Sequence, residues 1–332
     1  MRFRVVPVLF LAVCAGIVAS ASAETIRAYH IGNSLTDNIY MGGLKRIADR
    51  GGDTYIYGKH VSPGVPLDYS WQYKSITGSM YSIAPYGLYK TALKNYSWNV
   101  LTLEPFDNKL TGTTGDIQIS KDFINYALPK SPNLQTYVYE RWPRRQVDAR
   151  GHYLPFDFSK LWNTPYTGQS DRYNLADERR GYFEQLTKGI NSALPNLKKN
   201  VKMVPVGDVL AELDKRIKAN QIDGIDNITD LYADTIHFNK TGAYVISLTF
   251  YATMFKQSPL GHTVPGAFGT MNSTLAHEIQ DTVWDVVRVH PYAGVIQPPA
   301  ALGATLVPEP GSIFALLMAL PVMSLRRRRI DK

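Results

Sequence analysis

The chain has 332 residues, of which 45% are hydrophobic and 19% are charged, and this balance excludes a largely disordered protein. Its formal net charge is +8, but residues 1–23 carry +2 and residues 308–332 carry +3, which leaves +3 for the rest. The basic balance therefore belongs mostly to the two ends of the chain, and it gives no reason to expect a nucleic-acid partner.

Residues 1–23 have the three parts of a secretory signal peptide. Arg2 and Arg4 supply the positive start, VVPVLFLAVCAGIVA is the apolar run, and Ala-Ser-Ala at residues 21–23 matches a cleavage site. The apolar run is shorter than the roughly 20 residues that a membrane span needs. Cys14, the only cysteine, lies inside this segment, so we expect a mature protein without disulfides or thiolate metal sites.

The body of the chain alternates predicted strands with predicted helices. Runs rich in β-branched and aromatic residues predict strands at residues 25–31, 54–61, 98–104, 134–140 and 201–206. Apolar residues at helical spacing predict helices at residues 37–49, 84–96, 117–128, 175–194, 207–219, 240–257 and 275–289. Short strands that alternate with helices are typical of a parallel sheet covered on both faces. Residues 62–71 and 141–171 are predicted as loops, and a loop as long as the second is usually functional.

We predict one domain over residues 24–292, because no linker-like stretch or internal repeat interrupts it. Residues 293–306 are rich in Pro and Ala and are predicted as a linker. Residues 307–332 begin with VPEPGS, continue with an apolar segment at 313–325 and carry four arginines at 326–329. One interpretation is a C-terminal membrane anchor. The same three parts in this order resemble a PEP-CTERM sorting signal, which implies envelope sorting machinery as a partner, membrane contact before processing, and a location in the envelope or outside the cell.

Open parallel sheets bind their ligands beyond the carboxyl ends of the strands, so catalytic residues are expected on the loops at that edge. Ser34, in HIGNSLTDN, follows the first strand, and Asp234 and His237, in LYADTIHFN, lie three residues apart just before a helix. A serine nucleophile needs a histidine that takes its proton, and the histidine needs an acceptor that orients it. These residues predict a Ser-His-Asp triad, although serine and aspartate also occur at such positions simply as helix caps.

The two motifs are similar to the first and last sequence blocks of the SGNH (GDSL-like) hydrolases, with Asn33 in place of the usual aspartate. The resemblance covers roughly residues 25–290. It implies an α/β protein, a three-layer α/β/α sandwich with a five-stranded parallel flavodoxin-like sheet, and ester hydrolysis without a cofactor. It also implies that Ser34 is the nucleophile, that His237 is first base and then acid, and that Asp234 orients His237.

The resemblance further implies an oxyanion hole built from the Ser34 N–H group, a glycine and an asparagine. Gly64 follows the second strand, as the glycine of the family does. The G-x-N-D block that normally supplies the asparagine is not intact, and Asn108 in EPFDN is the nearest candidate. Glu104 stands where a small residue is expected. Loss of one oxyanion donor lowers the rate by a factor on the order of 10²–10³.

Other residues near the strand ends are expected to line the substrate cleft, and the tryptophan among them suits stacking on a sugar ring. They are Asn33, Glu104, Glu140, Arg141 and Trp142. No metal site is expected, because His30, His60 and His152 do not share a ligand spacing. The glycines form neither a dinucleotide-binding pattern nor a phosphate-binding loop.

The sequence therefore leaves two functions open. One is an exported serine ester hydrolase that forms an acyl-enzyme and removes an acetyl group from a carbohydrate or another small ester. The other is a non-catalytic envelope or matrix protein that uses the same fold to bind carbohydrate. The incomplete asparagine block and the sorting tail favour the second.

Overall fold

The computed structural model describes residues 23–74, 79–168 and 178–295. The predicted signal peptide, nearly all of the predicted linker and the predicted sorting segment lie outside these residues. Within the described ranges, no helix is long and apolar enough to cross a membrane.

One six-stranded sheet, in the order β3-β2-β1-β4-β5-β6, forms the centre of the described domain. Its strands are β1 (Thr25–Gly32), β2 (Thr54–Val61), β3 (Tyr81–Ser82), β4 (Val100–Leu103), β5 (Gln135–Tyr139) and β6 (Lys202–Val204). Five strands pair in parallel at the predicted positions, and β3 is added antiparallel to β2 at the edge. The predicted parallel flavodoxin-like sheet is confirmed, and the count of five strands is corrected to six. A two-residue strand is too short to produce a sequence pattern.

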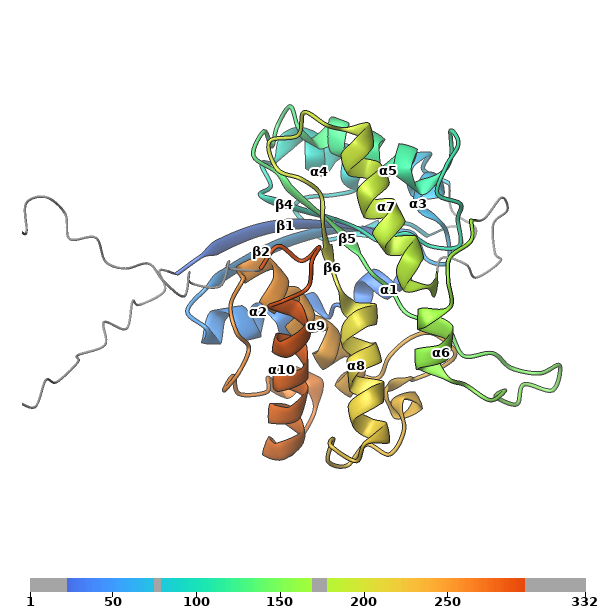
Figure 1. Ribbon diagram of the computed structural model, residues 1–332. Helices are drawn as coiled ribbons and strands as arrows, with labels where there is room; N and C mark the ends of the chain where they lie inside the picture. The colour runs from blue at the N-terminus through green and yellow to red at the C-terminus, as the bar shows by residue number, and fades with distance from the viewer. Residues whose placement is uncertain (1–22, 75–78, 169–177, 296–332) are drawn as a thin grey trace, which may run out of the picture. The chain divides into compact units, whose positions relative to one another are not determined.

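Helices cover both faces of this sheet and complete the predicted three layers (Figure 1). One face carries α2 (Met41–Arg50), α8 (Val206–Lys218), α9 (Lys240–Phe255) and α10 (Ser273–Val287). The other face carries α3 (Leu67–Trp71), α4 (Tyr89–Asn95), α5 (Asp116–Ala127) and α7 (Arg180–Ala193). Contacts with α2, α8 and α10 enclose α9, which explains why nearly all of its side chains are buried.

Shorter elements connect these layers. They are α1 (Ser34–Asp37), α6 (Phe158–Asn163) and the 3-10 helices η2 (Ile228–Leu231) and η3 (Gly266–Phe268). Helices α3 and α6 lie in segments predicted as loops, so those predictions are wrong. Tertiary contacts stabilise both helices: the ring of Trp71 stacks on Tyr89 at 5.4 Å, and Phe158 and Trp162 are fully buried. Helices of five or six residues are marginal without such packing.

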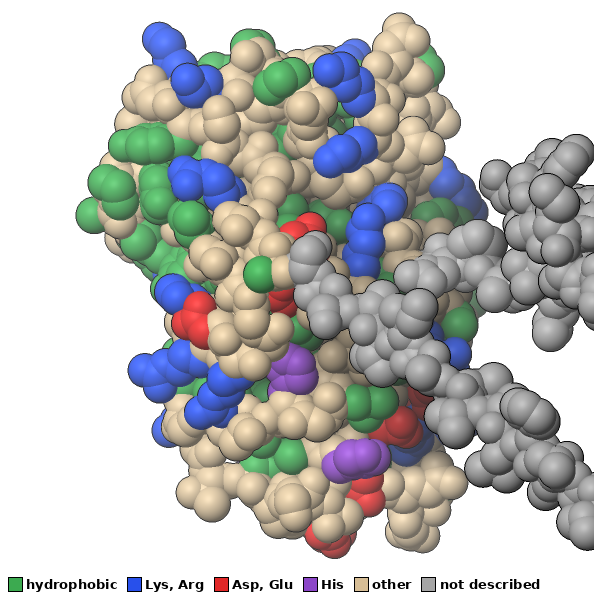
Figure 2. All heavy atoms as spheres, turned by 90° about the vertical axis from the view of Figure 1, so that its left-hand side faces the viewer, with side chains coloured by type: hydrophobic (Ala, Val, Ile, Leu, Met, Phe, Trp, Pro, Cys, Tyr) green, Lys and Arg blue, Asp and Glu red, His purple; other side chains and the backbone are tan. Residues whose placement is uncertain are grey.

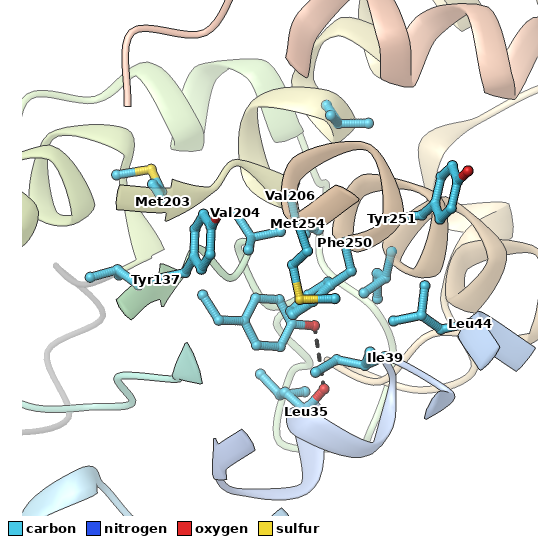
Figure 3. Close-up of a cluster of buried hydrophobic side chains, with 14 of the residues drawn as sticks. Leu35, Ile39, Leu44, Tyr137, Met203, Val204, Val206, Phe250, Tyr251 and Met254 are labelled. Atoms are coloured by element: carbon cyan, nitrogen blue, oxygen red, sulfur yellow. Dashed lines mark hydrogen bonds between the residues drawn. The ribbon is translucent and has the colours of Figure 1, made fainter. Parts of the chain in front are cut away.

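The core between the sheet and α9 fixes the short helix that carries Ser34. Phe250 and Met254 of α9 lie beside Leu35 and Val204 in this core (Figure 3). Leu35 is fully buried, which stabilises the fold by about 1.5–3 kcal/mol. The Tyr139 hydroxyl donates a hydrogen bond to the Leu35 carbonyl at 3.3 Å. The residue next to Ser34 is therefore anchored in the interior, and the end of β1 cannot move freely.

The face at the amino end of β1, on the left in Figure 1, shows a mixed surface (Figure 2). Lysine and arginine side chains are spread over this face among polar and hydrophobic ones, and they do not gather into a single stripe. This distribution is consistent with the small charge that remains once the ends of the chain are set aside. Nucleic-acid binding normally requires a concentrated basic surface, and this face does not present one.

Candidate active site

Ser34 lies at the carboxyl end of β1, as the sequence predicts. Asn33 caps the helix that begins at Ser34, because its side-chain oxygen accepts from the Leu35 N–H group at 2.9 Å. Gly32 precedes this turn, and a Cβ atom there would lie only 2.4 Å from the carboxylate of Glu104. The sequence Gly-Asn-Ser therefore combines a residue without a side chain, a helix cap and a hydroxyl at the edge of the sheet.

Asp234 and His237 form a closed turn just before α9. One carboxylate oxygen of Asp234 accepts from the backbone N–H groups of Ile236 and His237, at 2.8 and 2.7 Å. The other oxygen lies 2.8 Å from Nδ1 of His237. Burial disfavours the charged form of Asp234, but these hydrogen bonds outweigh it and lower the pKa of the carboxyl group. The carboxylate is therefore ionised at neutral pH and holds the ring in one orientation.

The two motifs meet, although 203 residues separate them in the sequence. Nε2 of His237 lies 2.8 Å from the Ser34 hydroxyl oxygen. We call Ser34, His237 and Asp234 the Ser-His-Asp chain. With the Nδ1 proton donated to Asp234, Nε2 can accept the serine proton, which is the arrangement that activates a serine hydroxyl. Ser34 is partly buried and His237 remains about one-third exposed, so a small ester can reach them from solvent.

Asn38 links the loops that carry the two motifs. Its side-chain amide donates to the Phe238 carbonyl, and its side-chain oxygen accepts from the Phe238 N–H group, each at 3.4 Å. These are long hydrogen bonds, yet the reciprocal pair joins the residue after α1 to the residue after His237. Sequence reasoning missed Asn38, although it stands in the same motif as Ser34.

Segment 141–145 packs against the loop 234–237 and supports it. The indole N–H group of Trp142 donates to the Ile236 carbonyl at 2.8 Å. The Trp142 ring also stacks on Phe238, with centroids 4.3 Å apart and planes inclined by 11°. Trp142 is fully buried, so it cannot stack on a sugar, and its expected place in the cleft is wrong. Its contacts instead fix the backbone on both sides of His237.

Two further hydrogen bonds join the same segments. The Tyr232 hydroxyl donates to the Pro143 carbonyl at 2.8 Å, and the Arg145 N–H group donates to the Thr235 carbonyl at 2.7 Å. The Arg145 guanidinium lies over the ring of Tyr153, 3.5 Å from its centroid. The long segment predicted as a functional loop is thus a support for the histidine loop, at least in its first residues.

A buried ion-pair network anchors this support. Arg141 is fully buried, and its guanidinium pairs with Glu178 at 2.9 Å and with Asp107 at 3.2 Å. Arg144 pairs with the same two carboxylates. Both guanidinium groups lie over the ring of Phe106, at 4.8 and 5.2 Å from its centroid. The expected role of Arg141 in an open cleft is therefore corrected to a structural one.

Replacing Trp142 by phenylalanine is expected to lower kcat for ester hydrolysis about tenfold. The change keeps an aromatic ring but leaves the Ile236 carbonyl without its donor, and small displacements of a catalytic group have large effects on rate. Trp98→Phe is a matched control, because the buried Trp98 also donates to a backbone carbonyl, that of Ala92 at 3.0 Å, outside the site. Equal kcat values in the two variants would contradict a positioning role for Trp142.

The other residues expected to line the cleft are also buried. Asn33 and Glu104 are each 1% exposed, and Glu140 is inaccessible. Glu140 accepts from the Asp208 N–H group at 3.0 Å. Burial, and then the nearby carboxylate of Asp208, raises the pKa of Glu140 well above its ordinary value. None of these three side chains is placed to contact a substrate directly.

Glu104 lies beneath the turn that carries Ser34. Its carboxylate accepts from the Asn33 N–H group at 3.0 Å and from the Thr36 hydroxyl at 2.7 Å. Burial raises the pKa of Glu104 to about 8, although both hydrogen bonds and the charge of Arg141 act in the opposite direction. The Glu104 side chain thus lies under the turn and holds its backbone through these two hydrogen bonds.

The raised pKa of Glu104 predicts a pH dependence of stability. Because the folded state holds this proton more tightly than the unfolded state, the stabilisation is present below about pH 4.5 and is lost progressively as the pH rises to about 8. Glu104→Gln removes this titration and keeps a side chain of the same size. The unfolding free energy of wild type and variant is measured with denaturant at pH 5 and pH 8. Between these pH values we expect the wild type to lose stability relative to the variant. A constant difference would contradict the assignment.

Two of the expected oxyanion residues, Gly64 and Ser34, are exposed or partly exposed. Gly64 is exposed and has a φ of +69°, a left-handed conformation that favours glycine, and a Cβ atom there would meet nothing within 4 Å. Its loop is tied to β1, because the Ser62 N–H group donates to the Gly32 carbonyl at 2.9 Å. Ser34 begins α1, where backbone N–H groups have no partner within the helix.

Asn108 does not fit the expected oxyanion role. Its side chain is inaccessible, and its amide donates both to the Thr114 carbonyl at 2.9 Å and to the Asp116 carboxylate at 2.8 Å. Both amide hydrogens are therefore used inside the protein. In the same loop, Asp107 has a positive φ of 46° and pairs with Arg141.

Within the described part of the chain, no group of three or more His, Cys, Asp or Glu side chains is arranged to hold a metal ion. The ring of His30 is buried between the hydroxyl groups of Thr102 and Tyr55, at 2.7 and 2.6 Å, and burial lowers its pKa to about 3. A pocket of about 1020 Å³ is lined by residues in and beside α6, α7, α8 and α10, and its lining includes no member of the Ser-His-Asp chain.

Comparisons with known proteins concern the fold of this chain. No protein-family model and no curated protein matches the sequence. A DUF4886 family protein from Bacteroides uniformis is 14% identical, with 79% of this chain and 95% of that chain covered and a TM-score of 0.51. The Clostridium thermocellum family 3 carbohydrate esterase is 15% identical, with 68% and 94% covered and a TM-score of 0.40. The periplasmic domain of a Salmonella lipopolysaccharide acetyltransferase is 12% identical, with 70% and 84% covered and a TM-score of 0.37. The Bacteroides protein shows that this α/β fold occurs elsewhere, and at these identities the likeness concerns the fold alone.

Proposed function

We propose that this protein is a serine ester hydrolase that works through an acyl-enzyme. The observation that carries the proposal is the continuous hydrogen-bonded chain from Ser34 through His237 to Asp234, with both ring contacts at 2.8 Å. The Ser-His-Asp chain lies at the carboxyl edge of a parallel sheet, where open α/β sheets bind their ligands. A helix cap or a structural histidine would need only one of these contacts.

The proposed reaction proceeds in two stages. His237 takes the proton of Ser34 while the serine oxygen attacks the acyl carbonyl, and the negative charge of Asp234 stabilises the imidazolium. The N–H groups of Ser34 and Gly64 donate to the oxyanion. His237 then gives the proton to the departing alcohol. The acyl group remains bound to the Ser34 oxygen. A water molecule, activated by His237 in the same way, releases the acid and restores the hydroxyl group.

The test is hydrolysis of 4-nitrophenyl acetate combined with labelling by a fluorophosphonate probe. We expect release of 4-nitrophenol, and we expect the probe mass on the peptide that contains Ser34. A fluorophosphonate reacts with a serine only when a base activates the hydroxyl group, so labelling reports the chemistry independently of the natural ester. Hydrolysis without label on Ser34 would show that another group is the nucleophile.

We further propose that the protein is exported and that its substrate is an acetylated carbohydrate. The secretory signal pattern at residues 1–23 and the sorting pattern at residues 307–332 support export to the envelope or beyond, where polysaccharides are abundant. In this proposal the tail contacts the membrane before envelope sorting machinery processes the protein. Fractionation of cells that express the full-length protein tests this location. Protein found in the cytoplasm alone would contradict export.

Non-catalytic carbohydrate binding is the second candidate function. The observation that favours it is the engagement of Asn108 by Thr114 and Asp116, which leaves the proposed oxyanion hole with two donors. A missing donor costs a factor on the order of 10²–10³ in rate, and this leaves considerable catalysis intact. Glycan binding without turnover and without fluorophosphonate labelling would support this function against the hydrolase.

A further inference from the structure

A pocket of about 330 Å³ lies one helical turn from Ser34. Its lining residues come from α1, α2, β2 and the segment that follows β3, and they are Asp37, Tyr40, Met41, Gly42, Tyr57, Lys59 and Ile83. Ser34 and Asp37 stand three residues apart on α1, so their side chains leave the same side of the helix. The pocket therefore begins on the same short helix that carries Ser34.

Tyr40 is the exposed aromatic ring of this pocket, with 43% of its surface accessible. Its backbone has a left-handed conformation, with φ of 49° and ψ of 60°, which is strained for a residue other than glycine. An edge-to-face contact with Phe268, with centroids 5.4 Å apart, holds the ring in place. An exposed ring kept in a strained position points to a use outside the core.

The polar groups of the pocket are a balanced pair. The Asp37 carboxylate accepts from the Lys59 ammonium group and from the Tyr81 hydroxyl group. A carboxylate has about four acceptor sites and an ammonium group has three donors, so both retain capacity for a ligand. Because the two charges cancel, the pocket selects neither an anion nor a cation. A ligand with hydroxyl groups on neighbouring carbon atoms suits this pair, because each hydroxyl group can donate to Asp37 and accept from Lys59.

We infer that this pocket binds a neutral sugar ring, the alcohol part of the ester that Ser34 attacks. Tyr40 stacks on the apolar face of the ring, while Asp37 and Lys59 bind its hydroxyl groups. The volume is at the lower end for small-molecule sites, which suits a single ring and not a long chain. This inference rests on the proposed hydrolase function for the reaction, but the binding of the sugar does not depend on catalysis.

The decisive variant is Tyr40→Gly. Glycine adopts a left-handed backbone without strain, so the change removes the ring and at the same time relieves the conformational cost at position 40. For a mono-O-acetylated methyl xylopyranoside we expect KM to rise about tenfold. For ethyl acetate, whose alcohol part has no ring to place on Tyr40, we expect kcat/KM to change less than twofold. Tyr40→Phe keeps the ring and is expected to retain the wild-type KM. Leu260→Ala, which truncates an exposed apolar side chain outside the pocket, is the control for non-specific effects.

A second measurement separates this inference from the proposed function. Titration of methyl xylopyranoside, which has no ester, is followed by NMR on the wild type and on Tyr40→Gly. Binding that is weakened about tenfold in the variant supports the pocket even if neither ester is hydrolysed. An unchanged KM and unchanged binding in Tyr40→Gly would overturn the inference, as would a wild type that hydrolyses 4-nitrophenyl acetate but does not bind the sugar.

Discussion

Replacing Ser34 by alanine is expected to lower kcat for 4-nitrophenyl acetate by a factor on the order of 10⁵–10⁶. The hydroxyl group is the acceptor of the acyl group in the proposed reaction, and it is the group that contacts Nε2 of His237 and can give up the proton. The effect of removing Ser34 and the effect of removing His237 should not add, because the two groups act as one unit. Steady-state rates of Ser34→Ala, His237→Ala and the double variant test both statements.

Ser273→Ala is a matched control for this change. Ser273 is the first residue of α10 and follows the capping residue Asn272, just as Ser34 is the first residue of α1 and follows Asn33. Each substitution removes a hydroxyl group from the first helical position and leaves the cap intact. We expect Ser273→Ala to retain wild-type activity. If Ser34→Ala retained most of the activity, the assignment of the nucleophile would be wrong, whatever the state of the fold.

Replacing Arg141 by alanine is expected to lower the free energy of unfolding by about 3–5 kcal/mol. Arg141 is fully buried, and its removal takes one of two paired arginines away from the buried carboxylates of Asp107 and Glu178. An uncompensated buried charge is among the most destabilising changes in a protein. Denaturant-induced unfolding of wild type and variant at pH 7 measures the loss.

Arg288→Ala is the corresponding control at the surface. Arg288 pairs with Asp285, and both side chains are substantially exposed. Exposed pairs contribute roughly 0–1 kcal/mol, because water and salt screen the charges. A loss below about 1 kcal/mol for Arg141→Ala would show that the network around Phe106 does not support the fold. We also expect a lower kcat in Arg141→Ala at temperatures where it remains folded, since residues 141–145 position the histidine loop.

The sequence by itself was sufficient for the fold class and for the two motifs. Strands such as VLTL and QTYVY are buried on both faces and therefore appear as continuous hydrophobic runs, which are visible without a structure. Ser34 and His237 could be paired because a serine nucleophile needs a histidine base, and because their two motifs resemble the first and last sequence blocks of one hydrolase family. Local signals also marked the ends of helices, as at Asn239, whose side chain caps α9.

Only the tertiary structure decided the roles of the residues between those motifs. A residue at the end of a strand can point into a cleft or beneath a loop, and the choice depends on how distant segments cover it. Trp142 and Glu104 illustrate this, because each lies under a loop that joins the site, and both loops belong to other parts of the sequence. Asn108 likewise stands at a suitable position in the chain, but its amide is used by neighbours eight residues away or fewer.

The difference has a physical cause. Periodicity and capping are properties of a few consecutive residues, so they can be recognised in the sequence alone. Burial, hydrogen-bond partners and pKa values depend on groups that are distant along the chain, such as Arg141 and Glu178, 37 residues apart. The sequence therefore determined which elements form and which chemical groups they carry. The packing of those elements decided which groups face solvent, as the ring of Tyr40 does, and which support the Ser-His-Asp chain.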